Sequence, residues 1–157
     1  MAIADDAVEV RAQGWRTLAA LHGRLEEALE KALQAEFGLS VVEYTVLDTL
    51  ARQDGWHMRM QQVSRAAALS QSATTRLVTR LENRGLLSRF LCPDDRRGIY
   101  SQITDQGRDL LERARPVHDA TLKEALDTAA AVPELARLVE ALHETASQEK
   151  PREAVRS

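Results

Sequence analysis

The sequence lacks the features of membrane, secreted and disulfide-stabilised proteins. No apolar run approaches the ~20 residues that a transmembrane helix needs. Residues 1–9 carry three acidic and no basic side chains, whereas a secretory signal starts with positive charge. Cys92 is the only cysteine, so we expect neither a disulfide within the chain nor a thiolate zinc cluster. These absences favour a cytoplasmic protein in a reducing compartment, with no membrane partner.

The common signatures of enzymes and metal sites are absent as well. The sequence contains no glycine-rich phosphate loop, no His-Glu-x-x-His pair and no nucleophile elbow. Its four histidines, His22, His57, His118 and His143, are scattered instead of lying on adjacent helical turns, as metal ligands do. We therefore expect a protein that is not an enzyme and has no catalytic residues, no bound metal and no cofactor.

Charge is strongly segregated along the chain. The 157 residues are 44% hydrophobic and 29% charged, which suits one soluble domain spanning residues 1–157. The formal net charge is −3, yet residues 59–97 hold eight arginines against three acidic residues and so carry +5. A basic middle between acidic ends would attract phosphate to one region and orient the protein on a nucleic acid. The alternative is that these arginines only solvate exposed helix faces.

Long helices are predicted at both ends of the chain. Residues 8–36 contain no proline and place Trp15, Leu18, His22, Leu25, Leu29 and Ala32 on one heptad-like seam. A helix this long cannot bury the whole stripe inside a small domain, which predicts packing on a partner. Helices are also predicted over 104–130 and 133–147. Thr104 is the predicted N-cap of the first, and Pro133 occupies position N1 of the second.

The middle of the chain predicts two short helices followed by a β-hairpin. Gly38 stops the first helix, and Ser40 with Glu43 forms a capping box for a helix over 41–52. Helices over 61–67 and from Ser70 to about Asn83 are joined by about three residues, as in a helix-turn-helix. Strands over 86–91 and 99–103, connected by residues 92–98, form a hairpin. Gly107 indicates that another backbone passes close to it.

The expected fold is therefore mainly α with a small β-hairpin wing (α+β), a winged helix-turn-helix with terminal dimerisation helices. Residues 40–103 form the DNA-binding lobe. The helix after Ser70 buries Ala73, Leu77, Val78 and Leu81 and turns its polar side chains outward. Among these, Gln71, Ser72, Thr75 and Arg76 offer an amide, two hydroxyls and a guanidinium to base edges in the major groove.

Further arginines suit the phosphates and the minor groove. We expect Arg59, Arg80 and Arg84 at phosphates and Arg96 and Arg97, on the hairpin tip, in a narrow minor groove. The complete set of candidate DNA-contacting residues is Arg59, Ser70, Gln71, Ser72, Thr74, Thr75, Arg76, Thr79, Arg80, Arg84, Asp95, Arg96 and Arg97.

The segment LSQSATTRLVTRLENRGL at 69–86, with Asp95-Arg96-Arg97-Gly98 and Ile103-Thr104-Asp105-Gln106-Gly107, resembles the MarR family of bacterial transcriptional regulators. The resemblance implies a homodimeric repressor on an inverted-repeat, double-stranded operator, associated with the nucleoid. It places the helices over 104–130 and 133–147 in the same dimerisation region as residues 8–36. It also implies release by a small phenolic or carboxylic effector, and a salt bridge in which Asp95 braces Arg97. Two positions depart from the pattern. Ala68 replaces a frequent glycine, so the turn should avoid a left-handed backbone there, and Thr79 replaces a commonly acidic residue and would permit a phosphate contact.

An effector would bind where the dimer helices meet the DNA-binding lobe, with Trp15, Arg16, His22, Tyr44 and His118 as candidate lining residues. Arg16 would hold a carboxylate, while Trp15 or Tyr44 would stack on an aromatic ring. The alternative is that Trp15 and His22 only pack in the helix seam. The sequence also leaves open a redox-responsive regulator acting through Cys92, a metal-responsive regulator, and a dimeric protein-interaction module without DNA binding.

Overall fold

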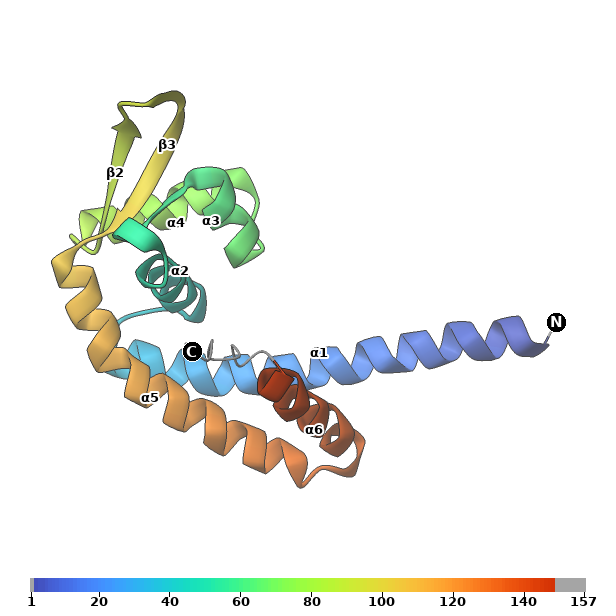
Figure 1. The fold of residues 1–157 in the computed structure, drawn as a ribbon. Helices are drawn as coiled ribbons and strands as arrows, with labels where there is room; N and C mark the ends of the chain where they lie inside the picture. Colours follow the sequence, from blue (N-terminus) through green and yellow to red (C-terminus); the bar gives the residue numbers. More distant parts are fainter. Residues whose placement is uncertain (1, 149–157) are drawn as a thin grey trace, which may run out of the picture. The chain divides into compact units, whose positions relative to one another are not determined.

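The computed structural model describes the backbone of residues 2–148 and the side chains of residues 6–94 and 98–145. This part of the chain is mainly helical with one small sheet, so the predicted fold class is confirmed. Its elements, shown in Figure 1, are α1 (Ala2–Phe37), α2 (Val41–Ala51), the 3-10 helix η1 (Asp54–Trp56), β1 (His57–Arg59), α3 (Met60–Ala67), α4 (Gln71–Asn83), β2 (Leu87–Cys92), β3 (Asp95–Ile103), α5 (Asp105–Ala130) and α6 (Pro133–Gln148).

The chain divides into two compact units. Among the described residues, unit 1 combines residues 2–28 with residues 120–148, and unit 2 spans Leu29–Asp119. Unit 2 therefore holds the end of α1, the start of α5 and all the elements between them. It contains the whole segment that the sequence assigns to the DNA-binding lobe.

Unit 1 has a small apolar core from three helices. Leu21 of α1, Ala129 of α5, and Leu135 and Val139 of α6 are buried together. α6 begins at Pro133, as the sequence predicts. α1 starts at Ala2, six residues before the predicted start, and much of its apolar surface stays exposed in the single chain. The large exposed side chains of this segment are Val8, Val10, Trp15 and Leu18, with exposed fractions of 59, 70, 68 and 47%.

The core of unit 2 is larger and begins where α1 ends. Gly38, with φ of +61°, closes α1, and the next residue, Leu39, is fully buried beside Leu33, Leu47 and Leu50. The predicted capping box is confirmed. The Ser40 hydroxyl accepts from the Glu43 N–H, and the Glu43 carboxylate accepts from the Ser40 N–H, both at 3.0 Å. These bonds satisfy two orphan donors at the start of α2.

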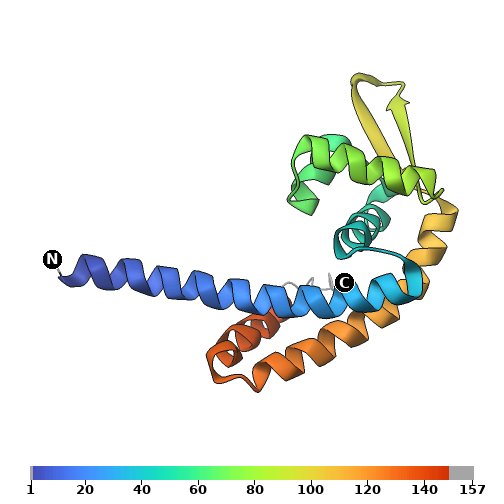
Figure 2. The same cartoon turned by 180° about the vertical axis from the view of Figure 1, so that it is seen from behind.

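The wing is a three-stranded antiparallel sheet in the order β1-β3-β2. Leu87 pairs with Ile103, and both are buried. β3 begins at Asp95, four residues before the predicted strand, because pairing continues past an irregularity at Leu91 and Cys92 to a Cys92–Asp95 pair. The predicted seven-residue connection is therefore wrong, and only Pro93 and Asp94 separate the strands. Figure 1 and, from behind, Figure 2 show β2 and β3 as a hairpin beside α4.

The hairpin returns to α5 through a tight junction. The Thr104 hydroxyl donates to Gly85 O at 2.6 Å and accepts from Gly107 N at 3.0 Å, which confirms Thr104 as a helix cap. A Cβ at Gly107 would collide with the carbonyl oxygen of Leu86 and lie 2.8 Å from Ile103 Cγ1. The predicted close approach of another backbone is thus confirmed, and it fixes the base of the wing against the start of α5.

Candidate nucleic-acid interface

The first turn of α4 is shaped by its own hydroxyl groups. Ser70 has an extended backbone, and its Oγ accepts from the Ala73 N–H at 3.2 Å, which confirms it as the N-cap. Leu77, Val78 and Leu81 are buried on the inner face. Gln71, Ser72, Thr75, Arg76 and Arg80 are exposed, and Thr79 is half-buried. α4 therefore turns an amide, two hydroxyls and two guanidinium groups away from the core.

Thr74 departs from its predicted place in this set. Its side chain is 1% exposed, and its Oγ1 donates to Ser70 O at 2.8 Å. A threonine can occupy the core face of a helix because its hydroxyl bonds to the carbonyl four residues earlier. Thr74 thus belongs to the inner stripe in the place expected for Ala73, which is half-buried. We therefore leave Thr74 out of the interface.

The turn between α3 and α4 has the left-handed conformation that the sequence argued against. Ala68 has φ of 53° and ψ of 42°. Its N–H donates to Arg65 O and the next N–H, of Leu69, donates to Ser64 O, the pattern of a Schellman motif. The prediction for Ala68 is wrong because these bonds, with half-buried Leu69 packed against the core, determine the backbone regardless of the side chain.

An open groove of about 780 Å³ lies between α4 and the sheet. α3 and α4 supply amide and hydroxyl groups and the side chain of Met60. The strands supply Ile99, Arg59 at the end of β1 and Arg89 in the middle of β2. The lining residues are Arg59, Met60, Gln61, Ser64, Gln71, Ser72, Thr75, Arg89, Gly98 and Ile99. The predicted residues Arg59, Gln71, Ser72 and Thr75 are thereby brought to one surface rich in hydrogen-bond donors.

Arg59 is held by the sheet. Its Nε donates to the Tyr100 hydroxyl at 3.0 Å, and its guanidinium carbon lies 5.7 Å from the Tyr100 ring centroid. Tyr100 stacks on Phe90 with ring centroids 5.6 Å apart, and His57 meets both rings edge-on. Cross-strand aromatic pairs of this kind stabilise a small sheet. The aromatic cluster therefore supports the end of the groove at which Arg59 lies.

Arg89 is a groove residue that the sequence did not single out. Its Nε donates to Glu82 Oε2 at 3.2 Å and its Nη2 to Glu82 Oε1 at 3.0 Å. The pair joins α4 to β2. Hydrogen bonding with Arg89 lowers the pKa of the Glu82 carboxyl and raises that of the guanidinium. The sequence could have identified Arg89 from the spacing of Leu87, Arg89 and Leu91 along β2. Residues two apart in a strand share a face of the sheet, so Arg89 lies on the same face as buried Leu87.

Arg84, which we predicted to bind a phosphate, donates to backbone carbonyls of its own chain. Its Nη1 donates to Gly38 O at 2.8 Å and its Nη2 to Phe37 O at 3.0 Å. The side chain thus satisfies carbonyls at the end of α1, which would otherwise lack helical partners. We assign Arg84 to this junction between α1 and α4. The side chains of Asp95, Arg96 and Arg97 lie outside the described ones, so the predicted wing-tip contacts and salt bridge stay predictions.

The five predicted effector residues fall into two groups. Trp15, Arg16 and His22 belong to unit 1 and are exposed, and Arg16 pairs with Glu9 at 2.7 Å. Tyr44 and His118 belong to unit 2, where their rings stack with centroids 4.2 Å apart and an interplanar angle of 11°. Tyr44 is 4% exposed, and burial is the largest cause of its raised pKa.

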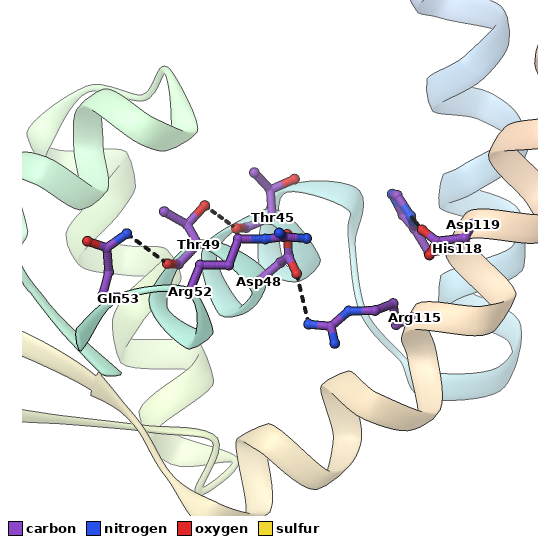
Figure 3. A network of polar contacts seen from close by, with 8 residues as sticks. All are labelled: Thr45, Asp48, Thr49, Arg52, Gln53, Arg115, His118 and Asp119. Carbon is purple, nitrogen blue, oxygen red and sulfur yellow. Dashed lines mark hydrogen bonds and ion pairs between the residues drawn. The ribbon is translucent and has the colours of Figure 1, made fainter. Parts of the chain in front are cut away.

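Polar residues missed by the sequence analysis surround this stack. Figure 3 shows Asp48 accepting from Arg115 in α5, with Arg52, His118 and Asp119 nearby. Arg115 Nη2 lies 3.1 Å from Asp48 Oδ1, and Arg52 Nε lies 2.9 Å from Asp48 Oδ2. The buried Nε of Arg115 has no acceptor within the described structure. A guanidinium therefore lies in the same network as an aromatic stack.

The described residues form neither a metal cluster nor a membrane-spanning helix. Among them, no group of three histidine, cysteine or carboxylate side chains has the geometry to hold a metal ion. No helix in the described range is both long and apolar enough to cross a bilayer.

Comparisons with known proteins agree with this geometry. The family model described as "MarR family" matches residues 37–98, which include α2, α3, α4 and most of the wing. AbsC, a MarR family transcriptional regulator from Streptomyces coelicolor, is 32% identical in sequence. Its structure aligns with a TM-score of 0.70 over 86% of this chain and 90% of AbsC. The chain belongs to the MarR family. Its winged-helix fold is the one that this family's structures have.

Two further MarR-type regulators broaden the comparison. Sco3205 of Streptomyces coelicolor, a MarR family regulator solved in complex with DNA, is 29% identical over 91% of this chain and 90% of its own, with a TM-score of 0.70. The regulator MhqR of Bacillus subtilis (strain 168) is 34% identical over 57% of this chain and 60% of its own length. The chain spans between half and three fifths of the first curated relatives it matches. All the relatives named here are transcriptional regulators, in agreement with the prediction that the chain is not an enzyme.

Proposed function

We propose that this MarR-family chain is a transcriptional regulator that binds double-stranded DNA sequence-specifically as a homodimer. The observation that carries the proposal is the outward face of α4. Gln71, Ser72, Thr75 and Arg76 are exposed on a helix whose opposite face is anchored in the core of unit 2. Amide, hydroxyl and guanidinium groups on a rigid helix are suited to read base edges in the major groove. The complex of Sco3205 with DNA supports the same role for this chain.

The phosphates would be bound by the basic middle of the chain. Residues 59–97 carry +5 against a net charge of −3, so the surface that includes α4 attracts the duplex while the rest of the chain does not. We assign Arg59 and Arg80 to phosphates, and we keep the proposal that Arg97, with Arg96, enters the minor groove while Asp95 braces Arg97. Thr79, half-buried and uncharged, would leave room for a nearby phosphate.

The homodimer would use the terminal helices, within residues 8–36 and 104–147. Val8, Trp15 and Leu18 are large apolar side chains toward one side of α1, and they are 47 to 68% exposed. An apolar face of this length is covered most economically by the same face of a second copy, in an isologous two-fold interface. Two α4 helices related by that symmetry would fit successive major grooves, ~34–36 Å apart, of an inverted-repeat operator. Bound at a promoter, such a dimer would act as a repressor.

A small aromatic acid is the proposed effector, with Tyr44, His118 and Arg115 as its site in unit 2. The partly exposed His118 ring, backed by buried Tyr44, would contact an aromatic ring, and Arg115, which pairs with Asp48, replaces Arg16 as the cation for a carboxylate. A ligand that favours a misaligned dimer by ~3 kcal/mol would weaken operator binding about a hundredfold. Benzoate is the probe, and Arg115→Gln should abolish its effect on DNA binding while Arg16→Gln retains it.

The decisive experiment selects bound duplexes from a random pool with the purified chain. We expect an inverted repeat to be enriched, Gln71→Ala to change the base preference at one position in each half-site, and Arg97→Ala to weaken binding to all selected duplexes. Arg113→Gln, an exposed arginine of α5, is the charge-matched control and should bind nearly normally. Failure to enrich any sequence, with a dimer intact in sedimentation, would instead support the interaction module without DNA binding.

A further inference from the structure

The groove between α4 and the wing contains an arginine whose direction is fixed before any ligand arrives. Arg89 donates from Nε and Nη2 to the two carboxylate oxygens of Glu82. Both side chains are about one third exposed, at 29 and 34%. Arginine has five N–H donors in a rigid planar fork, so two bonds to Glu82 leave three donors on the remaining edge. Arg89 lines the groove, which is where these donors are available.

The groove around Arg89 combines hydroxyl groups with apolar side chains. Ser72 and Thr75 of α4 and Ser64 of α3 bring hydroxyls to the same groove. The Thr75 hydroxyl donates to Gln71 O at 3.0 Å and the Ser64 hydroxyl to Met60 O at 3.1 Å. Because a phosphate only accepts hydrogen bonds, its donors in this groove are chiefly the three remaining N–H groups of Arg89. The large apolar side chains of the lining are Met60 and Ile99, and Ile99 is 50% exposed.

The geometry of a duplex indicates which anion would occupy this groove. One sugar-phosphate strand separates a major groove from the neighbouring minor groove, so a protein that reads both with two adjacent elements must accommodate that strand between them. The space between α4 and the hairpin is the groove lined by Arg89. We propose that this groove seats the strand that separates the two DNA grooves, that Arg89 binds one of its phosphates, and that Glu82 is the positioning residue for Arg89.

This inference rests on the proposed function. It assigns to Arg89 a directed hydrogen bond to one phosphate, which long-range charge attraction alone does not require. Glu82 offsets the charge of Arg89, so the pair contributes little to long-range attraction, and its value lies in directed hydrogen bonds. Arg–phosphate contacts are often bidentate, and lysine cannot reproduce the planar fork. A lysine at position 89 would keep the charge but could not bond two carboxylate oxygens and a phosphate in one plane. Arg89→Lys is therefore as informative as Arg89→Gln.

The test measures protein variants on duplexes in which one phosphate at a time has been neutralised. A duplex recovered by selection is prepared as a series in which single phosphates are replaced by neutral methylphosphonates. We expect the wild-type chain to lose about tenfold in affinity, the scale of one charge-assisted hydrogen bond, at one phosphate between the major-groove and minor-groove contacts of each half-site. Arg89→Gln and Arg89→Lys should bind the unmodified duplex more weakly and show no further loss at that phosphate. Arg113→Gln should retain the full loss.

Glu82→Gln separates positioning from a purely structural role. It removes a negative charge near DNA, so total affinity at low salt should not fall, yet the loss at the single phosphate should shrink because Arg89 is no longer fixed. Thermal unfolding measured by circular dichroism identifies variants that fold normally. The proposal is overturned if well-folded Arg89 variants lose as much as wild type at every phosphate. If the wild-type chain binds no duplex even at low salt, it is the proposed function that fails.

Discussion

Replacing Ala68 by glycine should stabilise the protein, although glycine is normally the weaker choice inside a helix. Ala68 ends α3 with φ of 53°, a conformation that costs a residue with a Cβ about 1–2 kcal/mol. Glycine removes that cost but adds about 0.4–1 kcal/mol of conformational entropy to the unfolded chain. The net expectation for Ala68→Gly is a gain of about 0–1.6 kcal/mol in the free energy of unfolding, with a central value of about 0.8 kcal/mol.

Ala66 provides a matched control two residues away. Ala66 and Ala68 are both exposed, but Ala66 lies inside α3. Ala66→Gly should therefore cost about 1 kcal/mol, the ordinary difference between alanine and glycine in a helix. Urea unfolding followed by circular dichroism measures both variants, at one fixed protein concentration because dimerisation changes apparent stability. Opposite signs are expected, and destabilisation by Ala68→Gly as large as that by Ala66→Gly would refute the left-handed turn.

Three further predictions follow from other contacts. Gly107→Ala should cost about 1–3 kcal/mol, as overpacking against backbone does, whereas Gly23→Ala, with nothing within 4 Å of the added Cβ, should be neutral or stabilising in thermal melts. Arg84→Gln should cost about 1 kcal/mol, because it replaces two charge-assisted hydrogen bonds to Phe37 O and Gly38 O by bonds to water. It should leave the salt dependence of DNA binding unchanged, whereas loss of a phosphate contact would reduce it. The pKa of the Glu82 carboxyl is lower in the folded protein than in the unfolded chain. The ion pair with Arg89 therefore contributes its full stabilisation above the pKa of the unfolded chain. This contribution is lost as the pH falls through the pKa of the folded protein. Glu82→Gln should therefore flatten the decline of stability below about pH 4.3, and an unchanged slope would count against the pair.

Local signals along the chain were sufficient for most of the fold. Ser40 with Glu43, Ser70 and Thr104 cap helices where the sequence places them, because each cap depends on residues within three or four positions. Gly107 identified a close backbone approach for a similar reason, since the absence of a Cβ is visible in the sequence itself. The family resemblance of residues 69–86 and the wing then supplied the order of these elements in space.

Two of the misses share a physical cause, which is contact between residues distant in sequence. Arg84 bonds to carbonyls 46 and 47 positions earlier, and the Tyr44–His118 stack joins α2 to α5. The hydrophobic periodicity of a sequence does not predict such long-range pairs. Thr74 was misplaced because its residue type suggests exposure, while its hydroxyl is satisfied within the helix. Ala68 was misjudged because packing of the turn outweighed the intrinsic preference of alanine.

The salt dependence of duplex binding tests the central claim most directly. Fluorescence anisotropy would follow the wild-type chain on a labelled, selected inverted repeat as monovalent salt rises from about 50 to 200 mM. If the α4 face and its flanking arginines bind the sugar-phosphate backbone, the logarithm of the binding constant should fall linearly with the logarithm of the salt concentration. The slope of this line should be about −0.9 for each neutralised phosphate. No binding at the lowest salt, or an affinity that salt leaves unchanged, would contradict the account.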